Sequence, residues 1–262
     1  MNARFELKNA TLGYDQRIIS QNLNLKIPEG EFTVIVGANA SGKSTLLKSL
    51  ARILKPLEGE ILLNQENIHQ LKTKEVAREV GFLSQNALAP EKMLVRDLVA
   101  QGRAPHQNIL RQWNAEDHEA VEKALKLTKT LELSNRYVDE LSGGQRQRVW
   151  IAMALAQDTE TILLDEPTTF LDLRHQIEIL ELCQRLHQEE NRTIVAVLHE
   201  LNQAARYATH LIAMKQGEII AEGTAESVVT ESKIDRIFGL KTKIIPDPVS
   251  GKPLVIPLEI NA

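Results

Sequence analysis

The sequence has few of the features that mark secreted, membrane-spanning or nucleic-acid-binding proteins. Its 262 residues include one cysteine, Cys183, so a disulfide within the chain is excluded and a reducing compartment is the simplest expectation. No run approaches the roughly 18 consecutive apolar residues that a membrane-spanning helix requires, and residues 1–6 lack the apolar core of a signal peptide. Lys and Arg number 31 against 35 Asp and Glu, which argues against a general nucleic-acid binder. We therefore expect a cytosolic protein, or one bound to a membrane surface through partners.

Short apolar runs along the chain predict an α/β fold. Residues 5–27 form brief apolar runs interrupted at Gly13, a pattern typical of antiparallel strands. Residues 32–36, 161–164 and 193–198 are apolar without polar alternation, which is typical of strands covered on both faces. Because helical segments separate these three runs, we predict a core with a parallel sheet behind an N-terminal antiparallel β subdomain.

The middle of the chain has a helical pattern from about residue 95 to residue 156. Asn114 is placed to cap a helix, and Asp117 lies in the first turn of that helix. We interpret residues 86–156, approximately, as a helical subdomain inserted into the α/β core. The alternative is that these helices are ordinary crossovers of the core itself.

The end of the chain returns to a β pattern. Residues 241–260 predict two strands, with Ser250 and Gly251 in the turn between them. The predicted organisation is a single domain over residues 1–262, with residues 240–262, approximately, as a C-terminal β extension.

A glycine-rich loop lies between a predicted strand and a predicted helix. Residues 37–44 read Gly-Ala-Asn-Ala-Ser-Gly-Lys-Ser and match the pattern G-x-x-x-x-G-K-S. In such loops backbone N–H groups converge on phosphate oxygens, and the helix N-terminus adds partial positive charge. We expect Lys43 to reach the β- and γ-phosphates and the Ser44 hydroxyl to coordinate Mg²⁺. The predicted nucleotide-binding residues of this segment are Gly37, Ala38, Asn39, Ala40, Ser41, Gly42, Lys43, Ser44 and Thr45.

Two acids end the apolar strand predicted at residues 161–164. Ligands of parallel α/β sheets lie beyond the carboxyl ends of the strands. Asp165 would there hold Mg²⁺, directly or through water, and Glu166 would polarise an attacking water as general base. A solvated acidic turn is the alternative.

The segment 141–148, Leu-Ser-Gly-Gly-Gln-Arg-Gln-Arg, precedes these acids. The order of phosphate loop, LSGGQ and strand ending in Asp-Glu resembles the ATP-binding-cassette (ABC) ATPase family over nearly the whole chain. The resemblance implies a P-loop NTPase fold, ATP and Mg²⁺ as cofactors, and a head-to-tail dimer with a second copy of this chain. LSGGQ would cap the γ-phosphate of the ATP that the second copy holds. The residues that take this role by resemblance are Ser142, Gly143, Gly144 and Gln145.

Four more positions are similar to functional positions of the family. By resemblance Tyr14 stacks on adenine, and Gln85 contacts Mg²⁺ or water and senses the transporter partner. Asp172 communicates across the dimer, and His199 hydrogen-bonds the γ-phosphate. For Tyr14 the alternative is local packing, for Gln85 and His199 an ordinary surface side chain, and for Asp172 a helix cap, a role that is compatible with the first.

The phosphate loop departs from the family at two positions. The family usually has Pro and Gly where this chain has Ala38 and Ala40. If position 40 requires a positive φ, alanine adds strain of about 1 kcal/mol. We expect nucleotide binding to survive, because both loop glycines, Lys43 and Ser44 remain.

Three segments resemble the branch of the family that serves iron-chelate uptake. They are residues 102–106 with Trp113 downstream, residues 198–207 and residues 247–255. The resemblance implies an ATPase that powers import of a ferric siderophore or ferric citrate, with membrane-spanning permease subunits as partners and a substrate-binding protein acting indirectly. It places the chain peripherally on the cytoplasmic face of the inner membrane, without a nucleic-acid partner.

Several alternatives remain open. Haem and cobalamin importers share much of the branch pattern, an exporter would usually fuse its membrane domain, and a non-transport ABC protein would usually carry two cassettes. We expect residues 85 to about 111 to receive a cytoplasmic helix of the permease, although an internal helix contact is the alternative. A zinc site at His106 has no second ligand at suitable spacing.

Overall fold

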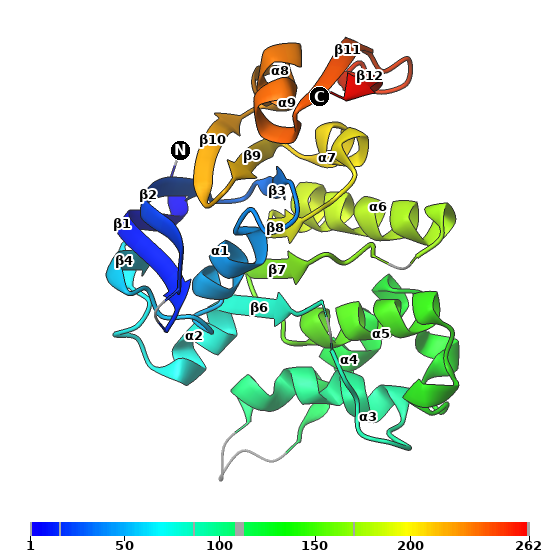
Figure 1. The fold of residues 1–262 in the computed structure, drawn as a ribbon. Helices are drawn as coiled ribbons and strands as arrows, with labels where there is room; N and C mark the ends of the chain where they lie inside the picture. Colours follow the sequence, from blue (N-terminus) through cyan, green and yellow to red (C-terminus); the bar gives the residue numbers. More distant parts are fainter. Residues whose placement is uncertain (1, 16, 86, 108–112, 170, 261–262) are drawn as a thin grey trace. The chain divides into compact units, whose positions relative to one another are not determined.

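The computed structural model describes residues 2–15, 17–85, 87–107, 113–169 and 171–260, with side chains up to residue 258. The chain forms two compact units. Figure 1 shows its helices and strands coloured along the sequence. Unit 1 contains residues 1–70 and 191–262, and unit 2 contains residues 71–190. Unit 2 therefore begins before and ends after the helical segment predicted at residues 86–156.

Unit 1 contains the predicted antiparallel sheet. Its strand order is β2-β1-β4-β5. Along β2 the buried Leu23, Leu25 and Ile27 alternate with exposed polar residues, as expected for a sheet with one face on the core. The strands are β1 (Ala3–Tyr14), β2 (Arg17–Pro28), β4 (Glu58–Leu63) and β5 (Glu66–Asn67).

Two of the three predicted parallel strands, those at residues 32–36 and 193–198, are in unit 1. β3 (Phe32–Gly37) pairs in parallel with β8 (Thr193–Val197) on one side and with β9 (His210–Lys215) on the other. β10 (Glu218–Gly223) pairs antiparallel with β9 and extends the sheet. Every residue of β3 is buried, which explains the apolar run without polar alternation.

Helices and a terminal hairpin complete unit 1. The helices are α1 (Lys43–Leu50), α7 (Leu201–Tyr207), α8 (Ala225–Val228) and α9 (Glu231–Phe238). β11 (Leu240–Pro246) and β12 (Pro253–Ile260) pair antiparallel. In the turn between them, Asp247 Oδ1 accepts hydrogen bonds of 2.8 Å from the backbone N–H groups of Val249 and Ser250. This confirms the hairpin predicted at residues 241–260; residues 261–262 of the predicted extension lie outside the described part of the chain.

Unit 2 joins a pair of parallel strands to a set of helices. β6 (Val80–Leu83) pairs in parallel with β7 (Thr161–Asp165). The remaining elements are α2 (Thr73–Glu79), α3 (Val95–Ala100), η1 (Gln101–His106), α4 (Ala115–Leu127), η2 (Leu131–Leu133), η3 (Val138–Glu140), α5 (Gly143–Ala156) and α6 (Leu173–Glu190). The predicted helical character of residues 95–156 is confirmed for the residues described.

The start of α4 confirms the predicted cap. Asn114 Oδ1 accepts from the backbone N–H of Asp117 at 3.1 Å, and the Asp117 carboxylate accepts from the N–H of Asn114. Two otherwise unpaired helix donors are thereby satisfied. Within the ranges described, no helix combines the length and the apolar character that crossing a membrane requires.

Candidate functional site

The glycine-rich loop of unit 1 connects β3 to α1 and takes its shape from three residues with positive φ. These are Gly37 at 151°, Ala40 at 60° and Gly42 at 99°. A Cβ at Gly37 would lie 2.1 Å from the carbonyl oxygen of Met214 on β9, so only glycine fits there. The value at Ala40 meets the condition under which strain was expected from the sequence.

Lys43 opens α1 and turns its side chain back onto the loop. Its Nζ donates hydrogen bonds of 2.9 Å to the backbone carbonyls of Gly37 and Ala38, and the residue is only 5% exposed. The ammonium is therefore held against the loop that the motif uses for phosphates. Ala38, Asn39 and Ala40 form the exposed tip of this loop, and Thr45 is buried in the first turn of α1.

Ser41 and Ser44 add hydroxyl groups to the same segment. The Ser41 Oγ is buried and has no hydrogen-bond partner within the described structure. Ser44, the second residue of α1, is half-buried. Phosphate oxygens are suitable acceptors for hydroxyls and N–H groups at such a helix start.

Unit 2 brings together two residues that the sequence separates widely. β7 is completely buried and ends at Asp165, which is 2% exposed, and Glu166 follows with a φ of 53°. The Glu166 Oε2 accepts hydrogen bonds from the Gln85 Nε2 and, at 3.2 Å, from the Thr169 Oγ1. Gln85 reaches this position because β6 runs parallel to β7, so the two strands end at the same edge.

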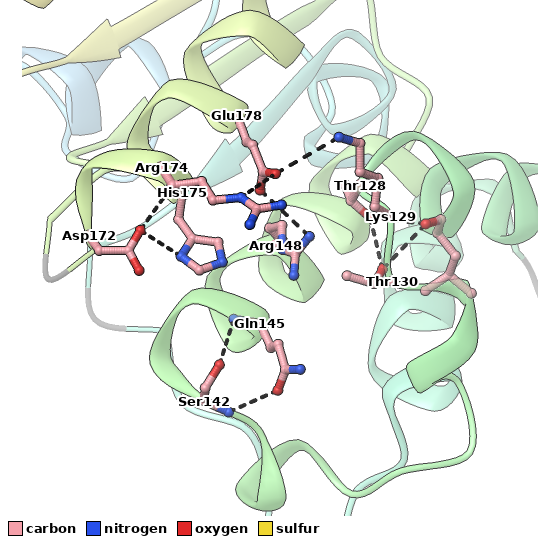
Figure 2. Close-up of polar contacts among 11 residues, drawn as sticks. Thr128, Lys129, Thr130, Ser142, Gln145, Arg148, Asp172, Arg174, His175 and Glu178 are labelled. Carbon is pink, nitrogen blue, oxygen red and sulfur yellow. Dashed lines mark hydrogen bonds and ion pairs between the residues drawn. The ribbon is translucent and has the colours of Figure 1, made fainter.

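The LSGGQ segment starts α5 in a reciprocal cap (Figure 2). The Ser142 Oγ accepts from the Gln145 N–H at 3.3 Å, and the Gln145 Oε1 accepts from the Ser142 N–H at 3.1 Å. A Cβ at Gly143 would meet no atom within 4 Å, so this glycine faces open space. The first turn of α5 carries no acidic residue. Its positive dipole end is therefore suited to an anion.

Asp172 caps the other long helix of unit 2. Its Oδ1 accepts from the backbone N–H of His175 at 3.0 Å and lies 2.8 Å from the His175 Nδ1. These bonds, the backbone one foremost, lower the pKa of the Asp172 carboxyl. The helix-cap interpretation of Asp172 is thus confirmed, and the carboxylate remains largely exposed.

Tyr14 and His199 lie at the ends of strands in unit 1. Tyr14 ends β1 and is 44% exposed. His199 follows β8, is exposed, and lines a cavity of about 420 Å³ that also involves Asn202, Phe238 and Val255. Both side chains are accessible, and their roles remain predictions.

The segment Gly102–His106, which carried the resemblance to a branch, makes structural contacts inside unit 2. The Arg103 Nε lies 2.9 Å from Asp117 Oδ1, and its Nη1 donates to the Ala156 carbonyl at 2.9 Å. The His106 Nε2 lies 2.8 Å from the Gln157 carbonyl. In the described residues, no three His, Cys, Asp or Glu side chains are grouped to hold a metal ion.

The predicted permease groove, residues 85 to about 111, is described except for Asn86 and residues 108–111. Leu88 in this segment is 90% exposed, whereas Val95, Leu98 and Val99 of α3 are buried within unit 2. Thr169 and His175, which bond the predicted site residues Glu166 and Asp172, were not predicted from the sequence. The position of His175 three residues after Asp172 was an available signal, since an N-cap bonds the third helical residue.

The sequence profile of the ABC transporter family matches residues 20–169, more than half of the chain. This chain belongs to the ABC transporter family. It is 52% identical over 98% of its length to the ferric enterobactin transport ATP-binding protein FepC of Escherichia coli K12, covering 94% of that protein. It is 45% identical over 95% of its length to the iron(3+)-hydroxamate import ATP-binding protein FhuC of Bacillus subtilis, covering 93% of that protein.

A solved structure supports the same assignment of the fold. An inward-facing conformation of a proposed metal-chelate type ABC transporter superimposes with a TM-score of 0.84 at 30% identity, covering 99% of this chain and 98% of that chain. The predicted α/β fold of a P-loop NTPase is therefore confirmed.

Proposed function

We propose that this chain is the ATP-hydrolysing subunit of an ABC importer for an iron(III) chelate, such as a ferric siderophore or ferric citrate. The observation that carries this proposal is the 52% identity over 98% of the chain to a ferric enterobactin transport ATP-binding protein. The glycine-rich loop, the capped LSGGQ helix and the hydrogen-bonded pair Gln85–Glu166 support it independently.

The loop of unit 1 binds the phosphates of ATP in this proposal. The backbone N–H groups of residues 37–45 and the ammonium of Lys43 meet the phosphate charge. The two carbonyls that now accept from Lys43 are weaker partners than a phosphate, so the ammonium can transfer to the nucleotide. Tyr14 stacks on the adenine, and His199 hydrogen-bonds the γ-phosphate.

The donors proposed for Mg²⁺ are all oxygen atoms. They are the Ser44 hydroxyl, the Asp165 carboxylate and the amide oxygen of Gln85, which suit a hard cation. A single carboxylate among the three fits a cation held mainly by nucleotide phosphates and water. When bound, Mg²⁺ supplies neutralisation of the phosphate charge.

Glu166 acts as general base in this proposal. Its carboxylate takes a proton from the water whose oxygen attacks the γ-phosphorus, while the bond to the bridging oxygen breaks and ADP leaves. Gln85 and Thr169 both donate to Glu166 Oε2, so the carboxylate has a fixed direction before water arrives.

A second copy of this chain completes the two ATP sites in this proposal. Ser142, Gly143, Gly144 and Gln145 cap the γ-phosphate held by the second copy, and Asp172 contacts that copy. Closure over two ATP molecules and reopening after hydrolysis form a two-state element. In this proposal each copy is a single ABC ATPase domain, with a helical subdomain inserted at approximately residues 86–156 and a β extension at approximately residues 240–262.

Permease subunits convert this motion into transport. The segment from Gln85 to about residue 111 is the proposed contact, and the 90% exposed Leu88 offers an apolar side chain to a cytoplasmic helix. The chain would then lie peripherally on the cytoplasmic face of the membrane. The substrate-binding protein would act on it only through the permease, and no nucleic acid would be a partner.

Uptake by cells that lack this chain tests the proposal. Labelled ferric siderophores, ferric citrate, haem and cobalamin are offered separately, and the cells are complemented with wild type or with Glu166→Gln. We expect one ferric chelate to fail to enter and wild type alone to restore it. Normal entry of every ferric chelate would overturn the iron-chelate assignment, and failure of haem or cobalamin alone would reassign the cargo.

A further inference from the structure

His175 on α6 lies against two segments of unit 2 that act on the second copy of the chain in the proposed function. One is Asp172, which caps α6 and lies seven positions after Asp165, the last residue of β7. The other is the LSGGQ start of α5. Figure 2 shows the His175 ring turned toward Asp172, with the capped start of α5, marked by Ser142 and Gln145, lower in the view. The residue is only partly accessible, with its side chain 28% exposed.

The bond to Asp172 fixes the orientation of the ring. Asp172 Oδ1 already accepts from the His175 backbone N–H at 3.0 Å, and the same oxygen lies 2.8 Å from Nδ1. A carboxylate with lowered pKa is an acceptor, so Nδ1 carries the hydrogen. Asp172 Oδ1 is therefore bonded to both the backbone and the ring of His175, and the bond at Nδ1 fixes the direction of the ring.

The ring also packs on the second glycine of LSGGQ. A Cβ at Gly144 would lie 3.2 Å from both Cγ and Nδ1 of His175 and 3.4 Å from Cδ2. A methyl group there would press on the ring at Cγ and its two ring neighbours, one of which, Nδ1, bonds Asp172. Gly144 thus lets the ring pack closely on the start of α5, and a methyl group there would require a shift of a few tenths of an ångström.

We propose that His175 is a positioning residue that fixes Asp172 and the LSGGQ start of α5 relative to each other. This inference rests on the proposed function, in which both segments act on the second copy. A displaced ring would release the Asp172 side chain from its second bond and remove the support of α5 at Gly144. Asp172 and the LSGGQ start would then no longer be held in one fixed arrangement when they meet the second copy. The affinity of the ATP-bound dimer would fall.

Three substitutions separate the two contacts. His175→Asn places an amide donor near the position of Nδ1 and loses most of the ring, whereas His175→Phe keeps the ring and loses the donor. His175→Ala removes both. Gln188→Ala, at an exposed position of the same helix, is the matched control.

The measurements are the kcat and KM of ATP hydrolysis and ATP-driven dimerisation in a Glu166→Gln background. We expect His175→Ala to lower kcat and dimer affinity at least tenfold, while ATP binding by the separate chain changes less than twofold. His175→Asn and His175→Phe should each recover part of the loss. In a double-mutant cycle, the losses of Asp172→Ala and His175→Ala should be less than additive, because both remove the side-chain bond at Nδ1, whereas Asp172→Ala alone also removes the backbone cap.

If wild type hydrolyses ATP and His175→Ala does so at the same rate with the same dimer affinity, the positioning role is overturned and the proposed function stands. Equal loss of folding in all three variants, judged by thermal unfolding against Gln188→Ala, would also overturn it, because the role would be structural. If wild type neither hydrolyses ATP nor dimerises, the proposed function fails, and this inference fails with it.

Discussion

The Nε of Arg103 lies 2.9 Å from the Oδ1 of Asp117 inside unit 2, and the two side chains are 5% and 0% exposed. Each group has a further partner, since Arg103 also donates to the Ala156 carbonyl and Asp117 accepts from Asn114. Breaking a buried ion pair by removing one partner leaves a charge that nothing compensates. The pair therefore links η1, α4 and the end of α5 into one packed body.

Removal of one partner should destabilise the protein more than removal of both. We predict that Asp117→Leu lowers the free energy of unfolding by about 3–5 kcal/mol, and that adding Arg103→Leu recovers part of this loss. Urea unfolding measures the effect. Glu122→Gln, which removes an exposed i,i+4 partner of Lys126, is the control and should leave the midpoint unchanged. A loss for Asp117→Leu as small as that of the control would contradict this account.

The positive φ at Ala40 predicts an unusual response to glycine. Glycine at position 40 removes the strain of a left-handed alanine, which stabilises the folded chain by about 1–2 kcal/mol. Glycine also increases the conformational entropy of the unfolded chain, which costs about 0.5–1 kcal/mol of stability. Ala40→Gly should therefore raise the free energy of unfolding by about 0.5–1 kcal/mol. Ala38→Gly, two positions earlier and without positive φ, should instead lower it by about 0.4–1 kcal/mol. The same direction of change in both variants would show that strain at position 40 is not the cause.

Cys183 should be unreactive until the protein unfolds. Burial raises the pKa of its thiol from the ordinary 9.0 to about 12, so the nucleophilic thiolate is scarce in the folded chain. At pH 8 we expect iodoacetamide to label Cys183 only after denaturant is added. Rapid labelling without denaturant would mean that the thiol is accessible.

The same shift has a consequence for stability. Above pH 9 the thiol ionises in the unfolded chain while it stays protonated in the folded one, so the unfolding free energy falls between about pH 9 and pH 12. The contribution is fully present below pH 9. The difference between wild type and Cys183→Ala isolates it from the other groups that titrate there, and a pH-independent difference would refute it.

Asn202 ties the C-terminal hairpin to the helix that follows His199. Its Nδ2 donates to the Val255 carbonyl at 3.1 Å, and its Oδ1 accepts from the Val255 N–H at 2.7 Å. Asn202→Ala should release β12, seen as at least tenfold faster amide hydrogen exchange at Val255. Asn202→Asp keeps the acceptor alone and should give an intermediate rate. Unchanged exchange in both variants would mean that strand pairing with β11 suffices.

Local signals predicted much of the fold. The buried strand β3, the helix that begins at Lys43, the cap at Asn114 and the turn at residues 250–251 all depend on residues close together in the sequence. The motifs located Gly37–Ser44, Asp165 and Glu166 for the same reason. Position 40 was suspected of positive φ only because related loops have glycine there.

The long-range pairings could not be predicted in this way. Gln85 and Glu166 are 81 positions apart, and their hydrogen bond follows from the parallel register of β6 and β7. Asp117 was expected only as a first-turn acid, because its charge partner Arg103 belongs to a different element. The contact between His175 and Gly144 depends on how α5 and α6 pack against each other, which the local sequence pattern of neither helix encodes.

The rate of ATP hydrolysis by Glu166→Gln tests the central claim most directly. Glu189→Gln, an exposed acid of α6 with the same change of charge, is measured beside it. The account predicts at least a 100-fold lower rate for Glu166→Gln with ATP binding retained, and a wild-type rate for Glu189→Gln. A wild-type rate for Glu166→Gln would contradict the assignment of Glu166 as the general base.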